Sequence, residues 1–228
     1  IKGMLQLLER DLKDSGMETE PAKMMFSEIE RIERLLKQLL MHSHPMPIKS
    51  QSFNLHELLD TVLSFERSSH PGLRFTAYYD ASLPDIEADR DKLHQVFLNL
   101  VRNASEACPA DGRVRVLTRH CAHWELAGTN LDPTRRYILV SIEDEGPGIP
   151  EELRKNIFKP LFSTKKQGTG LGLSISFRLV ESHGGQLRYQ PSERSGACFQ
   201  VILPESQSEP LEENSPNFVY QDLRKEIS

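Results

Sequence analysis

Three short segments marked by asparagine and glycine constrain this chain more than any other feature of its sequence. In chain order they are Asn99-Leu-Val-Arg-Asn103, Asp144-Glu-Gly146-Pro-Gly148 and Gly168-Thr-Gly170-Leu-Gly172. Glycine lets the backbone adopt unusual dihedral angles or approach another group closely. Each segment alone is a weak signal, so their meaning depends on the elements predicted around them.

The chain between residues 54 and 204 alternates between helical and extended patterns. Helices are predicted over 55–63, 89–106 and 171–183. Asn54 and Asp89 are suitable N-caps for the first two, and Gly184 ends the third. Strands are predicted over 74–79, 113–118, 136–143, 186–189 and 197–203. This pattern predicts an α+β fold, an α/β sandwich with one mixed sheet and helices on one face. The segment 120–135 is expected to be a long hairpin loop pinned by Trp124.

The chain is predicted to divide into four parts. Residues 1–44 carry two apolar helical seams and predict an antiparallel hairpin, and the prolines in 45–53 indicate a linker. Residues 54–204 form the main domain, and the polar tail 205–228 is expected to be disordered. The hairpin pairs with a second copy in a four-helix bundle or packs on its own domain, and the pattern slightly favours the dimer.

Composition narrows the function classes. A net charge of −5, from 28 basic and 33 acidic residues, disfavours nucleic-acid binding as the main function. The three widely spaced cysteines predict reduced structural thiols rather than a zinc site. No apolar run approaches the roughly 20 residues that span a bilayer. The chain begins inside a helical pattern at Ile1, so we expect a fragment, and an upstream membrane anchor or sensor domain stays open.

The asparagine pair on the second helix has two interpretations. Asn99 and Asn103 are four residues apart and share one otherwise apolar face. An amide on such a face needs hydrogen-bond partners, and a backbone group can supply them. Alternatively an amide oxygen ligates Mg²⁺, which prefers oxygen donors beside substrate phosphates. The helix alone leaves the two interpretations about even.

The aspartate and glycine segment follows a predicted buried strand. Asp144 is then held at a pocket floor, where its carboxylate can accept a hydrogen bond from an exocyclic amine such as that of adenine. Gly146 and Gly148 allow backbone to pass close to a flat ring. The alternative is an ordinary Asp-Glu-Gly turn.

The glycine-rich segment opens the third helix and suits an anion cradle. Backbone amides and the helix N-terminus of Gly168 to Gly172 can bind phosphate. The segment lacks the Gly-Lys-Ser/Thr of a P-loop and the βαβ unit of a dinucleotide fold. A flexible lid over phosphates is the remaining interpretation. Lys165 and Lys166 are expected to contact phosphate oxygens. Phe158 and Phe162 are expected to pack beneath the lid.

These segments, with Phe158-Lys-Pro-Leu-Phe162-Ser-Thr-Lys165 before the last, resemble the ATP site of sensor histidine kinases of the GHKL ATPase superfamily, and of the nitrogen-regulatory and sporulation branch in particular. The resemblance implies that Asn103 ligates Mg²⁺, Asp144 selects adenine, and Arg102 and Lys165 neutralise phosphate charge. It implies a catalytic set of Asn99, Arg102, Asn103 and Lys165. It implies a nucleotide-binding set of Asn103, Asp144, Gly146, Gly148, Phe162, Lys165, Gly168, Thr169, Gly170, Leu171 and Gly172.

The resemblance also implies a reaction and partners. The γ-phosphoryl group of Mg²⁺-ATP passes to a histidine and then to an aspartate of a response regulator, in a homodimer on the cytoplasmic side. None of the eight histidines lies in the His-Glu-x-x-Asn-Pro-type segment that carries the acceptor in this family, so we expect it upstream of Ile1. Two alternatives remain: a gyrase- or MutL-type ATPase, and a non-catalytic nucleotide-binding or dimerisation module. Asn99, where gyrase-type relatives carry the water-activating glutamate, argues against the ATPase.

Overall fold

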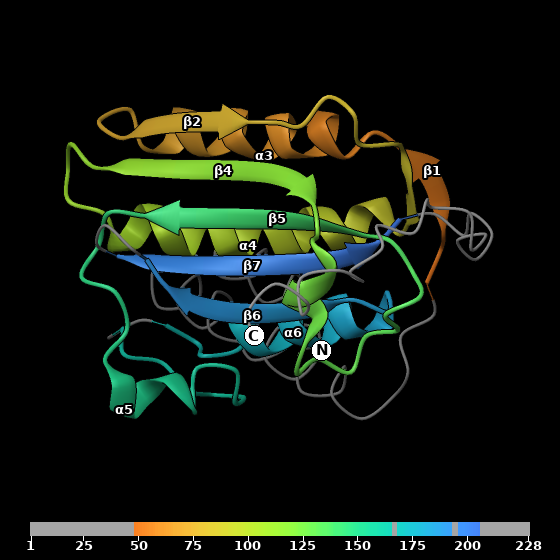
Figure 1. Cartoon of the computed structure of the whole chain (residues 1–228). Helices are drawn as coiled ribbons and strands as arrows, with labels where there is room; N and C mark the ends of the chain where they lie inside the picture. The colour runs from red at the N-terminus through yellow and green to blue at the C-terminus, as the bar shows by residue number, and fades with distance from the viewer. Residues whose placement is uncertain (1–47, 166–167, 193–195, 206–228) are drawn as a thin grey trace, which may run out of the picture.

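One five-stranded sheet organises residues 48–165, 168–192 and 196–205, the parts of the chain that the computed structural model describes. The strands are β2 (Arg74–Tyr78), β4 (Arg113–His120), β5 (Tyr137–Asp144), β7 (Ala197–Pro204) and β6 (Gln186–Pro191), named in their order across the sheet. β2 and β4 run parallel and the other neighbours antiparallel, so the sheet is mixed as predicted (Figure 1). The predicted hairpin and the tail beyond residue 205 lie outside the described residues.

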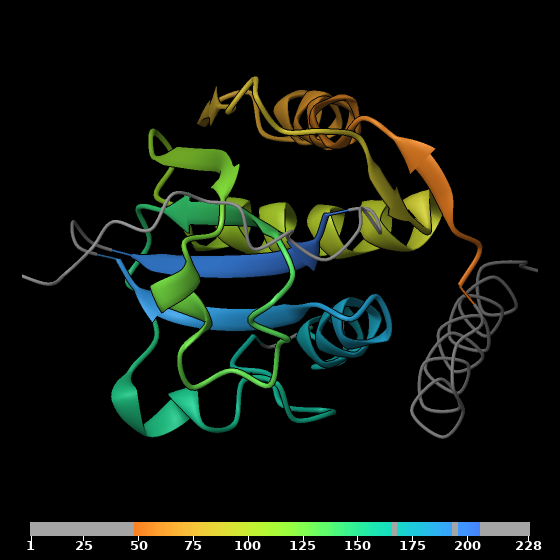
Figure 2. The ribbon, with the colours of Figure 1, turned by 45° about the vertical axis from the view of Figure 1, so that its right-hand side comes forward.

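Three helices cover one face of this sheet. They are α3 (Leu55–Ser69), α4 (Arg90–Ala107) and α6 (Gly172–Ser182), and α4 lies between the other two (Figure 2). The predicted N-caps are confirmed, because Asn54 accepts from two backbone amides of α3 and Asp89 accepts from Lys92 N. Gly184, with φ +69°, ends α6 as expected.

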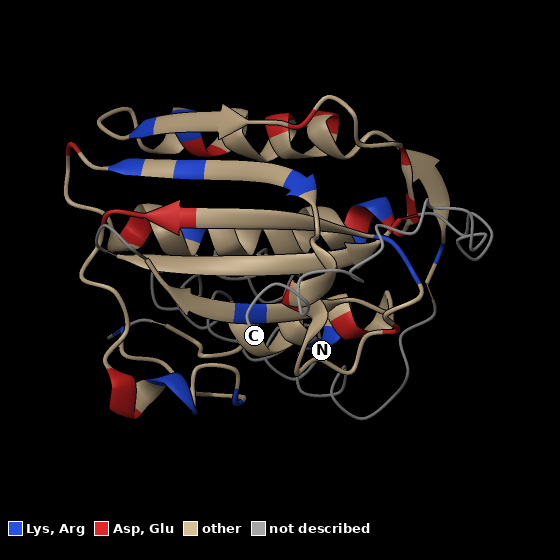
Figure 3. Ribbon diagram, viewed as in Figure 1, with Lys and Arg blue, Asp and Glu red and all other residues tan. Residues whose placement is uncertain are grey.

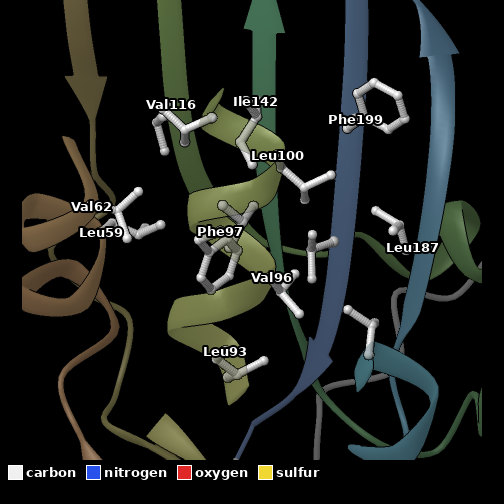
Figure 4. Close-up of a cluster of buried hydrophobic side chains, with 14 of the residues drawn as sticks. Leu59, Val62, Leu93, Val96, Phe97, Leu100, Val116, Ile142, Leu187 and Phe199 are labelled. Atoms are coloured by element: carbon white, nitrogen blue, oxygen red, sulfur yellow. The ribbon is translucent and has the colours of Figure 1, made fainter. Parts of the chain in front are cut away.

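The core lies between the helices and the sheet, and α4 supplies its centre (Figure 4). Leu93, Val96, Phe97 and Leu100 are fully buried, at the 3–4-residue spacing of one helix face. The sheet contributes the alternate residues of each strand, such as Val114 and Val116 of β4. This packing fixes the azimuth of α4 and therefore the direction in which its polar residues point.

The other face of the sheet is polar and partly covered by the β4–β5 connection. The blue bands along β4 are arginines, and the first of them lie beside the acidic end of β5 (Figure 3). Arg115 is buried and pairs with Glu143 at 3.0 Å, and its Nη1 lies 3.5 Å from Glu145. Two hollows of 490 and 670 Å³ lie on this face, which is the face opposite the helices.

The prediction that Trp124 pins the 120–135 loop is wrong. Trp124 lies in the short 3₁₀ helix η1 (His123–Leu126) and is 76% exposed. Its neighbours hold the loop instead: Leu126 is buried with strand residues, and Glu125 accepts two hydrogen bonds from Arg119 at 2.6 and 2.7 Å. A bidentate pair at a buried carboxylate is a stronger anchor here than an indole whose ring lies in solvent.

Two elements lie at the edge of the main layer. β1 (Gln51–Phe53), at the end of the predicted linker, pairs antiparallel with β3 (Ile86–Ala88). The short helix α5 (Glu151–Arg154) lies between β5 and α6 in the chain. Within the described ranges, the helices are all too short or too polar to cross a bilayer.

Candidate functional site

Asp144, the last residue of β5, forms the floor of the candidate site. Only 3% of its surface is exposed, and its Oδ1 accepts hydrogen bonds from Gly146 N at 2.9 Å and Ala197 N at 3.1 Å. Burial raises the pKa of this carboxyl, and the two backbone donors oppose that rise. Among the described residues both bonds fall on Oδ1, which leaves the second carboxylate oxygen as the candidate acceptor for a ligand's donor.

The glycines around Asp144 are needed for space. A Cβ on Gly146 would lie 2.6 Å from the carbonyl oxygen of Ala107, the last residue of α4. Gly196 has a φ of +87°, and a Cβ there would overlap the backbone of Asp144. Gly148, at φ +73°, lies against Gly196 in turn. The floor is therefore a tight packing of backbone segments from α4, β5 and β7.

Asn99 joins α4 to the start of α6. Its Nδ2 donates to Ser176 Oγ at 3.0 Å, and its Oδ1 fills the space that a side chain on Gly172 would need. The amide thus satisfies the hydrogen-bonding requirement of an apolar helix face and sets the position of α6. The last glycine of the Gly-rich segment is explained by this contact.

Asn103, one turn after Asn99, faces the segment before α6. Lys165 donates from Nζ to Asn103 Oδ1 at 3.1 Å and forms an ion pair with Glu106. Two side-chain oxygens of α4 therefore accept hydrogen bonds from one ammonium group. This donor chemistry fits the hard, oxygen-preferring Mg²⁺ that the family resemblance implies. Among the described residues no cluster of three His, Cys, Asp or Glu side chains suits a metal ion.

The loop before α6 is rooted at a close backbone crossing. Gly170, with φ +67°, lies so close to Leu161 and Phe162 that a Cβ would overlap their backbone. Leu161 itself has φ +64° and is 61% exposed. Phe162 packs partly against the core, and the ring of Phe158 lies 5.3 Å from that of Phe177 of α6. The loop is therefore anchored at its base by aromatic packing, as the sequence predicts.

Thr169 and Leu171 complete the Gly-rich segment. Thr169 Oγ1 accepts from Leu171 N at 3.4 Å, and Leu171 is fully buried at the N-cap position of α6. Gly168 is exposed, and its amide donates to the carbonyl of Lys165 at 3.1 Å. These contacts order the turn that leads into α6.

Arg102 points away from the other predicted residues. Its Nε lies 3.2 Å from Glu66 Oε1 of α3, and its guanidinium lies 5.9 Å from the ring centroid of Phe65. Glu66 is fully buried, so this ion pair holds a carboxylate that has lost its water. The remaining predicted residues, Asn99, Asn103, Asp144, Lys165 and the glycines, gather around the last turns of α4 and the start of α6.

Two residues of the site were missed by the sequence argument. Glu106 follows Asn103 by three positions and lies on the same helix face, so the helical period already indicated it. Ser176 follows Gly172 by four positions and faces Asn99 by the same rule. Both are ordinary surface-type residues in sequence, and only the partner helix or loop gives them a role.

Comparison with known proteins assigns the chain to a family. Residues 88–207 match the model of the family described as histidine kinase-, DNA gyrase B- and HSP90-like ATPases. The chain belongs to this family. It is 35% identical over 207 residues to the sensory histidine kinase/phosphatase NtrB of Azospirillum brasilense, and 32% identical over 207 residues to sporulation kinase C of Bacillus subtilis. Each alignment covers 90% of this chain. The chain therefore contains the ATPase domain of the histidine kinase type.

Solved structures agree with this assignment. The catalytic domain of histidine kinase ThkA in a nucleotide-free form matches 69% of this chain and 97% of its own, with 32% identity and a TM-score of 0.59. ThkA in complex with the response regulator protein TrrA matches 89% of this chain and 57% of its own, with 28% identity and a TM-score of 0.61. The α+β architecture of the described residues is thus that of histidine kinase catalytic domains. The chain spans 51% of the A. brasilense relative and 45% of the B. subtilis one.

Proposed function

We propose that this chain binds Mg²⁺-ATP at the edge formed by β5, α4 and α6 and transfers the γ-phosphoryl group to a histidine. The observation that carries this proposal is the fixed Asp144 carboxylate, whose Oδ1 accepts two backbone hydrogen bonds, at the same end of α4 as Asn103 and Lys165. Membership in the ATPase family and similarity to histidine kinases support it.

Each residue has a defined task in this proposal. Asp144 accepts a hydrogen bond from the exocyclic amine of adenine through its second oxygen. Asn103 ligates Mg²⁺, which when bound neutralises charge on the phosphates. Lys165 adds a point charge, and the amides at the start of α6 bind phosphate oxygens. Phosphoryl transfer passes through a loose transition state, so positioning and charge neutralisation are the main requirements.

Asn99 favours a kinase over a hydrolase. Its amide donates to Ser176 and packs on Gly172, so it is a structural link between α4 and α6. An amide also has no basic group with which to activate water. The alternative of a hydrolytic ATPase therefore lacks a base at this position.

The acceptor and the partner belong to the whole protein. Because none of the chain's histidines lies in a His-Glu-x-x-Asn-Pro segment, we place the acceptor in another part of the full-length kinase. A response regulator is the proposed receiver, in keeping with the complex of ThkA with TrrA. The proposal includes a homodimer through the 1–44 hairpin and a position in the cytoplasm, where ATP is available.

Calorimetric titration with a non-hydrolysable ATP analogue tests the proposal. We expect saturable binding that strengthens with Mg²⁺, and an Asn103→Ala variant that binds equally with and without the metal. Glu87→Gln, an exposed change on β3, is the control and keeps wild-type affinity. Absence of binding in both conditions contradicts the proposal, and multiple-turnover phosphate release in the isolated chain favours the ATPase.

A further inference from the structure

Lys165 lies where the proposed metal would act. Its ammonium group contacts both the Oδ1 of Asn103 and the carboxylate of Glu106, which are one helical turn apart on α4. Both partners of the ion pair are nearly half exposed, at 44% and 42%. The contact is therefore reversible, as expected for an ion pair at the surface.

The position of Lys165 is connected to the backbone of the loop. Its own amide donates to Ser163 Oγ at 3.1 Å, and its carbonyl accepts from Gly168 N at 3.1 Å. Holding the ammonium on α4 therefore also positions the backbone of Lys165, which contacts Ser163 and Gly168. The loop continues directly to the Gly170 crossing and α6.

A divalent cation and this ammonium compete for the Asn103 oxygen. Mg²⁺ binds its oxygen ligands at about 2.0–2.1 Å. A lysine ammonium 3.1 Å from the same oxygen is then a second positive charge at close range, and the two repel. Occupation of Asn103 by metal therefore favours movement of Lys165 away from this oxygen.

We propose that Glu106 is a positioning residue that holds Lys165 over Asn103 when the site is free of nucleotide, and that metal-bound nucleotide displaces this lysine toward the phosphates. The proposal rests on the function proposed above. The negative charge of Glu106 explains this role. Without metal, the phosphates are repelled by the Glu106 carboxylate while Lys165 is paired with it. Nucleotide binding therefore depends more strongly on Mg²⁺ than it would without Glu106.

Hydrogen exchange without nucleotide tests the contact itself. In the full chain, Glu106→Gln should raise exchange of the peptide that contains the Lys165 and Gly168 amides by about two- to fivefold, the range of a surface ion pair. Lys165→Met should do the same, and the double variant should exchange no faster than either single variant. Glu87→Gln is the matched control. Unchanged exchange in Glu106→Gln overturns the proposal whether or not nucleotide binds.

Calorimetry tests the consequence for binding. We expect Glu106→Gln to lower the ratio of the metal-free to the Mg²⁺-bound dissociation constant of the ATP analogue by about two- to fivefold. A wild-type ratio in this variant overturns the proposed displacement. If the wild-type chain does not bind the nucleotide analogue, the proposed function is contradicted instead. The hydrogen-exchange measurement still shows whether Glu106 holds Lys165.

Discussion

The two ends of the candidate site are built differently. At the proposed adenine end, Asp144 is buried and held by backbone amides, and glycines pack against it without room for a side chain. At the proposed phosphate end, Asn103, Glu106 and Lys165 meet through side chains that lie partly in solvent. Backbone fixes the first end, whereas reversible ionic contacts hold the second.

The difference suits the order of events in nucleotide binding. A rigid floor discriminates a base because its acceptor cannot move to suit another pattern of donors. A loop held by exposed ion pairs can rearrange when metal and phosphate arrive, at a cost of about 1 kcal/mol or less per pair. Variants that perturb each end separately should therefore have effects of different size and kind.

The largest expected effect is on stability at the rigid end. Gly196→Ala forces a side chain into left-handed backbone and into Asp144, and should lower the free energy of unfolding by about 2–4 kcal/mol. Gly168 is exposed and has no left-handed backbone, and a Cβ there would meet only side-chain atoms of Ser163 and Lys165, so Gly168→Ala should cost less, about 1 kcal/mol. Urea unfolding of both variants measures the contrast, and equal losses would show that the two ends are equally rigid.

The second effect is on affinity. Asp144→Asn removes the charge that accepts from the base and should weaken binding of the ATP analogue by about 1.5–3 kcal/mol, or about 10- to 150-fold. The fold should persist, because the asparagine oxygen can still accept from Gly146 N and Ala197 N. Calorimetry gives the affinity and circular dichroism the fold. Wild-type affinity in this variant would remove Asp144 from the site.

Much of the rigid end could be predicted from sequence. Strong β propensity predicted β5, and the positions of Asp144, Gly146 and Gly148 relative to it followed directly. The need for Gly196 depends on β7 packing beside β5, which is a contact over 52 residues that local pattern does not determine. Sequence therefore located the floor, and tertiary structure explained its glycines.

The phosphate end was less predictable. The helical period placed Asn99 and Asn103 on one face, but α6 and α3 decide that Asn99 bonds Ser176 and that Arg102 turns toward Glu66. Glu106 gains its role only from a lysine 59 residues away. The prediction for Trp124 was wrong for a similar reason. Two hydrogen bonds from Arg119 to Glu125 anchor this loop, and the Trp124 ring is exposed.

The third effect is the pH dependence that Asp144 causes. Its contributions to nucleotide affinity and to the free energy of unfolding change with pH in opposite directions. Because burial raises the pKa of Asp144 above 3.8, the folded state holds its proton more tightly than the unfolded state. This group therefore contributes stability below pH 3.8 that is lost as the pH rises through the folded pKa. Nucleotide binding needs the carboxylate, so affinity should fall as the pH drops through the same pKa, by at most about tenfold per pH unit.

Asp144→Asn is the control for both pH slopes. The lowered pKa of His56, caused mainly by burial, acts in the opposite direction on stability, because folding then weakens below about pH 6.5. The difference between wild type and Asp144→Asn cancels this contribution. Titrations of analogue affinity and of unfolding from pH 7 to 4 should diverge in wild type and not in the variant. Parallel slopes in both proteins would mean that Asp144 does not carry the effect.

The smallest effect tests the backbone conformation of Leu161, at the base of the loop that forms the phosphate end. Leu161 holds a left-handed conformation that costs a leucine about 1 kcal/mol, and 61% of its surface is exposed. Leu161→Asn keeps that backbone at lower cost and should raise the free energy of unfolding by about 0.5 kcal/mol. Leu161→Ala removes the same apolar contacts but keeps the Cβ penalty, so it is the matched control in urea unfolding. If the asparagine variant is no more stable than the alanine variant, the left-handed backbone of Leu161 does not destabilise the protein. The low stability of the phosphate end is then due to its exposed ion pairs.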